Sequence, residues 1–161
     1  MVRRYQESDR QEVVEMIASL RGFLAKLKSI KKNLDLEAAD DELQSYLRKG
    51  FPVFVVDSPD GLAGYLVCKI DDDVVWAESI FVRPEYRRKG IASSLYIEAE
   101  RLAQELGSDT VFNWVHPNNK VSISFLKKRG YTVLNLIEVR RPWKDEKLTT
   151  KIQVEENEFD Y

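Results

Sequence analysis

A basic loop with a single glycine separates a strand-like apolar run from a long helical pattern. The run ends at Val82, the loop includes Arg87–Gly90, and helical spacing begins at Ile91. The first N–H groups of a helix have no intrahelical partner, and the helix dipole adds about half a positive charge there. Arginine and lysine add full charges, and a glycine lets the backbone approach a ligand closely. These residue types in this order are suited to binding a phosphate or pyrophosphate.

Few other side chains suggest chemistry of their own. His116 is the only histidine and therefore the only side chain that ordinarily titrates near neutral pH, which makes it a candidate base. Cys68 is the only cysteine, so no internal disulfide forms, and we interpret it as a core residue rather than a nucleophile. The triplet Asp71–Asp73 has no spaced ligands around it, which favours a tight hairpin turn. No metal site is predicted.

Composition indicates one ordinary globular domain covering residues 1–161. Of the 161 residues, 43% are hydrophobic and 32% are charged, which is enough for a core and a solvated surface. The net charge of −2 provides no general attraction to nucleic acid or membrane, so an anion site has to be local. No apolar signal core or membrane-length run is present in the sequence, and we expect a cytoplasmic protein.

Hydrophobic periodicity predicts an α/β (α+β) arrangement around one mixed, mostly antiparallel sheet. The expected strands are 2–5, 51–56, 62–70, 74–82, 110–115, 131–141 and 147–154. The expected helices are 9–27, a second one capped by Asp40 or Asp41 and ending near Lys49, 92–106 and 120–129. The three strands from 51 to 82 form a meander, and residues 155–161 form an acidic tail.

Residues Arg87–Ala92 resemble the pyrophosphate loop of the GNAT superfamily, the acyl-CoA-dependent N-acetyltransferases. The superfamily pattern is Arg or Gln, two residues, Gly, one residue, and Gly or Ala, and this chain reads Arg-Arg-Lys-Gly-Ile-Ala. The stretch Asn119–Tyr131 resembles the second signature, an Asn, a short helix carrying a Tyr, and then Gly-Phe. The resemblance implies about seven strands and about four helices, with a splay between the strands ending near Val82 and Val115.

The same resemblance implies that acetyl-CoA is the cosubstrate. Backbone N–H groups after Arg87 would hold the pyrophosphate, and strand residues ending at Val82 would pair with the pantetheine arm. Asn119 would contact that arm, although its residue type also suits a helix N-cap. The residues expected to contact acetyl-CoA are Ile80, Phe81, Val82, Arg87, Arg88, Lys89, Gly90, Ile91, Ala92, Ser93, Asn119 and Ser122.

Glu78 is the candidate general base. It lies four residues before Val82, so strand alternation would place both side chains on one face. The surrounding stretch resembles the polyamine acetyltransferase branch, in which an acid near this point acts as a base through water. Two alternatives remain open, namely a structural hydrogen-bonded Glu78 and deprotonation by ordered water alone.

Leu126 departs from the superfamily pattern. It falls where the family carries a Tyr that protonates the leaving thiolate, and a leucine side chain has no proton to donate. Ser122, one helical turn earlier, or a water molecule would have to replace that acid.

The sequence therefore predicts an N-acetyltransferase that transfers an acetyl group from acetyl-CoA to a primary amine by direct attack. An acetyl-CoA-binding regulator with a degenerate catalytic centre is the alternative that Leu126 suggests, and a domain for a nucleotide other than CoA is a third. The acceptor, a small molecule or a protein, is not identified by any residue. No nucleic-acid or membrane partner is expected, and because the last strands are able to pair between subunits, a homodimer is one expected arrangement.

Overall fold

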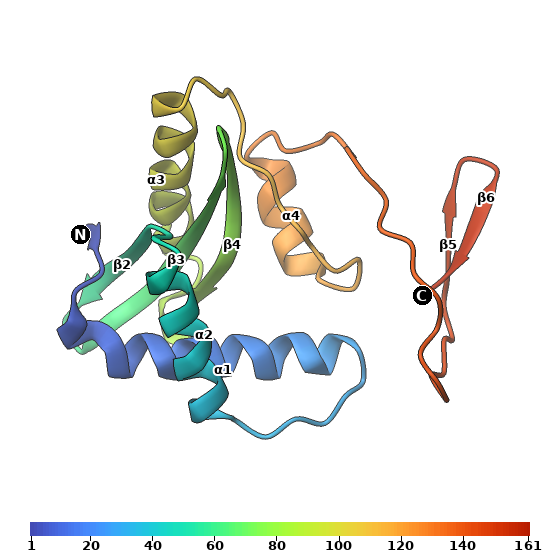
Figure 1. Ribbon diagram of the computed structural model, residues 1–161, viewed down its shortest axis with the longest axis horizontal. Helices are drawn as coiled ribbons and strands as arrows, with labels where there is room; N and C mark the ends of the chain where they lie inside the picture. The colour runs from blue at the N-terminus through green and yellow to red at the C-terminus, as the bar shows by residue number, and fades with distance from the viewer. The chain divides into compact units, whose positions relative to one another are not determined.

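The computed structural model describes residues 1–161, which form two compact units, Met1–Phe125 and Leu126–Tyr161. The first unit contains an antiparallel sheet whose strands follow the chain order (Figure 1). Its strands are β1 (Val2–Arg4), β2 (Val53–Ser58), β3 (Gly61–Asp71) and β4 (Val74–Val82). The predicted three-strand meander is therefore confirmed, and both of its hairpin turns lie where the turn residues predicted them.

Helices cover both faces of this sheet. α1 (Arg10–Leu27) and α2 (Leu36–Arg48) pack on the face that carries Val55 and Val67. α3 (Ile91–Glu105) contacts β2, β3 and β4 on the opposite face. Because successive strand residues point to opposite faces, the continuous apolar runs of β2 and β3 fill both layers of the core. None of the α-helices combines the length and the hydrophobicity that a membrane crossing requires.

The predicted start of α2 at Asp40 or Asp41 is wrong. The helix begins at Leu36, because the Asp35 carboxylate accepts a hydrogen bond from the Ala38 N–H group at 2.9 Å and caps the helix. Several carboxylates precede this helical pattern, so residue type alone does not identify the cap. The other three helices lie close to their predicted ranges.

The predicted strand at 110–115 forms only one bridge to the sheet. Phe112 pairs with Trp76 in parallel orientation, donating to the Val75 carbonyl at 2.8 Å and accepting from the Ala77 N–H group at 3.0 Å. Immediately after this point β4 bulges, and its register with β3 shifts. A bulge bends and twists the strand that carries it, so pairing along this edge ends here.

The second unit begins within α4 (Lys120–Lys128) and contains a hairpin of β5 (Lys151–Val154) and β6 (Asn157–Asp160). The predicted strand at 131–141 is wrong, because these residues form no regular structure and their apolar side chains are exposed, as at Val133. Alternating residues make a strand only where a neighbouring segment satisfies the backbone hydrogen bonds.

The predicted acidic tail is also corrected, since its residues form β6. The Lys151 ammonium group binds Glu158 at 3.3 Å and Asp160 at 2.5 Å across the hairpin, so the acidic side chains have a partner that the linear sequence does not reveal. The expected sheet of about seven strands is thus a four-stranded sheet and a separate two-stranded one. The mixed α/β class with four helices is confirmed, and a single domain over residues 1–161 stays a prediction.

Candidate functional site

The loop between β4 and α3 gathers backbone N–H groups. After the short 3-10 helix Pro84–Tyr86, φ is positive at Arg88 (62°) and at Gly90 (81°) but not at Lys89 between them. Backbone that alternates in this way tends to turn successive N–H groups toward one concave side, an arrangement suited to anions. A Cβ placed on Gly90 would meet no protein atom within 4 Å, so the space beside this glycine is open to a ligand.

The loop leads directly into the N-terminus of α3. The first hydrogen bond of the helix joins the Ser94 N–H group to the Gly90 carbonyl at 3.0 Å. The N–H groups of Ile91, Ala92 and Ser93 therefore have no helical partner, and the positive end of the helix dipole lies at the same place. The predicted pyrophosphate contacts at these residues are consistent with this geometry and stay predictions.

The basic side chains of the loop differ in what they already bind. Arg87 donates from Nε to the Val82 carbonyl at 2.9 Å, and its guanidinium lies 5.4 Å from the centre of the Phe81 ring. The Lys89 ammonium lies 5.4 Å from the centre of the Tyr86 ring. Arg87 thus fastens the loop to the end of β4, which is a structural task that the sequence pattern did not indicate.

The second half of β4 offers further backbone donors. The Arg83 N–H group donates to the Ala63 carbonyl of β3 at 3.0 Å. Bonded and non-bonded pairs alternate along an antiparallel ladder, and counting back from Arg83 along the register leaves Ile80 and Val82 in non-bonded positions. Their N–H groups therefore face away from β3, toward the edge that Phe112 leaves after its single bridge.

Glu78 is the extra residue of the β4 bulge, because Ala77 pairs with Cys68 and Ser79 already pairs with Val67. The bulge interrupts the alternation of side chains, and the prediction that Glu78 shares a face with Val82 is therefore wrong. A bulge commonly re-aims one side chain in this way.

The charge of Glu78 acts on the α2 side of the sheet. Burial, a hydrogen bond to Glu42 and the Glu78 charge together raise the pKa of Tyr46 in α2. The neighbouring Ser79 is buried and its hydroxyl lies 2.7 Å from the Tyr65 hydroxyl, on the same side as the α1 and α2 core. Glu78 thus lies beside a group of polar side chains rather than alone on an apolar strand.

The polar side chains of α1 and α2 in this group were not found from the sequence. Arg21 of α1 forms a short hydrogen-bonded ion pair with Glu42 of α2, and the Tyr46 hydroxyl donates to Glu42 at 2.6 Å. Glu42 and Tyr46 have the spacing of one helical turn, which was the only local signal. Arg21 lies on a separate helix, and no short-range pattern connects it to them.

Three further sequence predictions concern single residues. Asn119 is buried and its side-chain oxygen accepts from the Ser122 N–H group at 3.1 Å, so its interpretation as an N-cap is confirmed, while its contact with the pantetheine arm stays a prediction. Burial and the nearby Lys28 lower the pKa of His116, which is therefore neutral at pH 7. Cys68 is fully buried, which raises its pKa to about 12 and confirms its interpretation as a core residue.

Leu126 is half-buried in the last turn of α4, at the start of the second unit. Its backbone carbonyl accepts from the N–H groups of Arg129 and Tyr131 at 2.9 and 3.1 Å, which ends the helix. Its side chain offers no proton, as expected from the sequence.

Residues 20–131 match the model of the acetyltransferase (GNAT) family, and the chain belongs to that family. The match confirms the family that the sequence motifs had suggested.

Individual relatives agree with this assignment. A spermidine N(1)-acetyltransferase of Thermoplasma acidophilum is 32% identical over 72 residues, a match that spans 45% of this chain and 45% of the relative. Among solved structures, an aminoglycoside antibiotic 6'-N-acetyltransferase from Acinetobacter haemolyticus superposes with a TM-score of 0.70 at 16% identity. The match covers 90% of this chain and 99% of that enzyme's chain. A variant of a Bacillus halodurans protein has a TM-score of 0.75 at 15% identity, covering 89% and 99%. At these identities the structures show the shared fold.

Proposed function

We propose that the protein is an N-acetyltransferase that transfers an acetyl group from acetyl-CoA to a primary amine by direct attack. The observation that carries the proposal is the continuity of backbone donors from the free edge of β4 to the start of α3. Ile80 and Val82 present N–H groups along that edge, and Gly90–Ser93 presents the next set within a basic loop. The extended pantetheine arm, which ends in a pyrophosphate, fits this row of N–H donors.

The donor chemistry fits the two parts of the cosubstrate. Amide N–H groups along a strand edge suit the amides and carbonyl of the pantetheine arm, as in strand addition. N–H groups at a helix start, with Arg88 and Lys89 beside them, suit the pyrophosphate. Bound acetyl-CoA would supply a thioester whose carbonyl carbon accepts the amine.

The chain's own residues support two steps of the transfer. The Ile80 N–H group donates a hydrogen bond to the oxygen on which negative charge develops, a contribution commonly worth about 3 kcal/mol. Glu78 accepts, through a water molecule, the proton that the acceptor ammonium loses before its nitrogen attacks. The neutral nitrogen then forms a C–N bond with the carbonyl carbon while the C–S bond breaks. The sulfur leaves as a thiolate, and the nitrogen gives its second proton to water as the amide forms.

The leaving thiolate receives no proton from Leu126. An ordinary thiol pKa of about 8.5 makes a thiolate a tolerable leaving group, so the acid is not indispensable. Ser122, whose backbone N–H group is held by Asn119, is the nearest hydroxyl one turn earlier on α4 and is the proposed substitute, directly or through water.

A second function is favoured by Leu126. Without the acid, the protein would bind acetyl-CoA and transfer its acetyl group poorly, acting as a regulator that responds to acetyl-CoA.

For the enzymatic function, the relative named spermidine N(1)-acetyltransferase makes small polycationic amines the first acceptors to test.

Thermal unfolding and thiol release together test these functions. Acetyl-CoA at about 100 times its dissociation constant should stabilise the fold by about 2.7 kcal/mol, and ATP or NAD should have a smaller effect. Release of free CoA thiol is expected with at least one of a panel of mono-, di- and polyamines. Stabilisation by acetyl-CoA without thiol release on any amine would favour the regulator, and stabilisation by ATP or NAD alone would contradict both functions.

Replacing Leu126 with tyrosine should raise kcat about tenfold or more, because it restores a general acid where the family carries one; such acids typically contribute about 10²–10⁴-fold. The comparison is steady-state thiol release by the wild type, Leu126→Tyr and Leu126→Phe. Phenylalanine matches the ring but lacks the hydroxyl, so it should not raise kcat. Equal rates for the two variants would mean that the hydroxyl does not reach the sulfur.

A further inference from the structure

Three aromatic side chains meet where the segment after α3 leaves the sheet. We call Trp76, Phe112 and Trp114 the aromatic platform. The ring centre of Trp76 lies 5.1 Å from that of Phe112 and 5.0 Å from that of Trp114, with interplanar angles of 39° and 51°. Trp114 is 72% exposed, so its ring is accessible to a ligand.

The platform lies on the same side of the sheet as Glu78. Trp76 pairs with Lys69 of β3. Lys69 lies two residues from Val67 and four from Tyr65, so its side chain points to the same face as theirs, the one that α1 and α2 cover. Glu78 lies two residues after Trp76 and acts on Tyr46 of α2. Two residues of a regular strand span about 7 Å, which is an upper limit for Trp76 and Glu78 because the bulge at Glu78 bends β4.

Within the unit Met1–Phe125, no lysine or arginine lies over a ring of the platform. Elsewhere Arg4 lies 4.2 Å from the centre of the Phe54 ring, and Arg140 lies 3.7 Å from that of Trp143. Lys69, the cation nearest to Trp76 in the strand register, instead binds Asp71 at 3.1 Å. The negative faces of the platform rings are therefore available to a cation from outside the protein.

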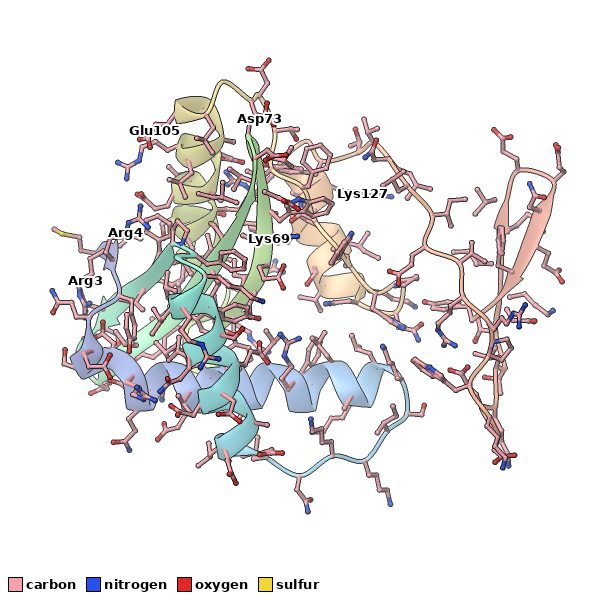
Figure 2. All side chains as sticks on the ribbon, viewed as in Figure 1. Arg3, Arg4, Lys69, Asp73, Glu105 and Lys127 are labelled. Carbon is pink, nitrogen blue, oxygen red and sulfur yellow. The ribbon has the colours of Figure 1, made fainter.

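The charges around the platform favour the same kind of ligand. The β3–β4 hairpin carries four carboxylates, Asp71, Asp72, Asp73 and Glu78, but only one ammonium group, that of Lys69. Figure 2 shows Asp73 at the tip of the hairpin, with Lys69 farther along it. A cation is thus attracted to both ends of the Trp76 segment.

We propose that the aromatic platform binds a second, non-reacting ammonium group of the acceptor, so that the acceptors are diamines and polyamines rather than monoamines. This inference rests on the proposed function, in which the first amine loses its proton toward Glu78. Trp76 and Glu78 lie at most about 7 Å apart along β4, a span that suits two nitrogens joined by an alkyl chain of a few carbons. Tryptophan is the best aromatic partner for an alkylammonium ion, and the platform supplies two.

The test compares Trp114→Leu with Trp143→Leu in the full chain. Both tryptophans are exposed, but the Trp143 ring is already covered by Arg140 and should not contribute. Trp114→Leu should lower kcat/KM for 1,4-diaminobutane and spermidine about three- to thirtyfold and leave kcat/KM for butylamine unchanged. Trp114→Phe, which keeps an aromatic face, should recover part of the loss. Equal losses for butylamine and diaminobutane would overturn the proposal.

A binding measurement keeps the proposal testable if no amine is acetylated. Tetramethylammonium is a cation without N–H donors. An aromatic face therefore binds it, whereas a carboxylate site that relies on hydrogen bonds gains less binding energy from it. It should quench the fluorescence of the wild type and of Trp143→Leu with the same saturation curve, while neutral tert-butanol should not. Saturation that survives unchanged in Trp114→Leu would overturn the proposal, whatever the outcome of the activity assays.

Discussion

Replacing Gly90 with alanine is expected to weaken acetyl-CoA binding about tenfold or more. Gly90 has φ of 81°, and its position beside the unpaired N–H groups of Ile91–Ser93 is where a phosphate would approach the backbone. A methyl group there projects into the open space beside the loop and disfavours the left-handed conformation that turns the N–H groups inward. Charge-assisted hydrogen bonds contribute about 1.5–3 kcal/mol each, so losing one accounts for the effect.

Gly107 provides a matched control at the opposite end of α3. It has the same φ of 81°, and a Cβ there would also meet no protein atom within 4 Å. Alanine at either position should therefore lower the free energy of unfolding by a similar amount, about 1 kcal/mol. Isothermal titration with acetyl-CoA should show weakened binding only for Gly90→Ala. Equal affinities of the two variants would contradict a pyrophosphate site at this loop.

Glu78→Gln is expected to lower kcat about 100-fold or more while acetyl-CoA affinity stays unchanged. The substitution keeps the shape and hydrogen-bonding capacity of the side chain but removes its ability to accept a proton, and such proton transfers contribute about 10²–10⁴-fold. The deficit should shrink as the pH approaches about 10, because alkylammonium groups then lose their proton to solvent without a base. The measurement is the pH profile of kcat with 1,4-diaminobutane for the wild type and the variant.

Glu98→Gln is the control for this substitution. Glu98 is a half-buried carboxylate of α3, on the other side of the sheet, where it accepts from Arg101 at 2.6 Å. Its substitution should leave the pH profile of kcat unchanged. A rate for Glu78→Gln equal to that of the wild type across the pH range would show that ordered water suffices for deprotonation.

The surroundings of Gly90 were predictable from the sequence, whereas those of Glu78 were not. The conformation of the loop was predictable because it depends on contiguous residues: a glycine that accepts positive φ, basic neighbours and the start of a helix. These are local preferences of the backbone, and the structure places them as expected, with Gly90 left-handed at the start of α3. The meander and the ranges of α1, α3 and α4 were predictable for the same reason, since their periodicity is visible within one segment, whereas the start of α2 was not.

The orientation of Glu78 was not predictable, because it depends on a bulge that appears only when β4 is paired with β3. Strand alternation assumes an uninterrupted ladder, and a single inserted residue reverses it. The Arg21–Glu42–Tyr46 group and the aromatic platform have the same origin. Each joins residues of separate elements that come together only through the packing of helices on the sheet.

The residues after Gly130 show the same limit. An alternating apolar pattern at 131–141 predicted a strand, yet a strand exists only through hydrogen bonds with a neighbour, and the identity of that neighbour is not written in the segment itself. The acidic residues after Glu156 formed a strand because Lys151 and the preceding backbone lay within reach. Local conformation, including the open N–H groups at the start of α3, thus follows from adjacent residue types. Strand partners, the orientation of Glu78 and the grouping of side chains around it follow from long-range pairing.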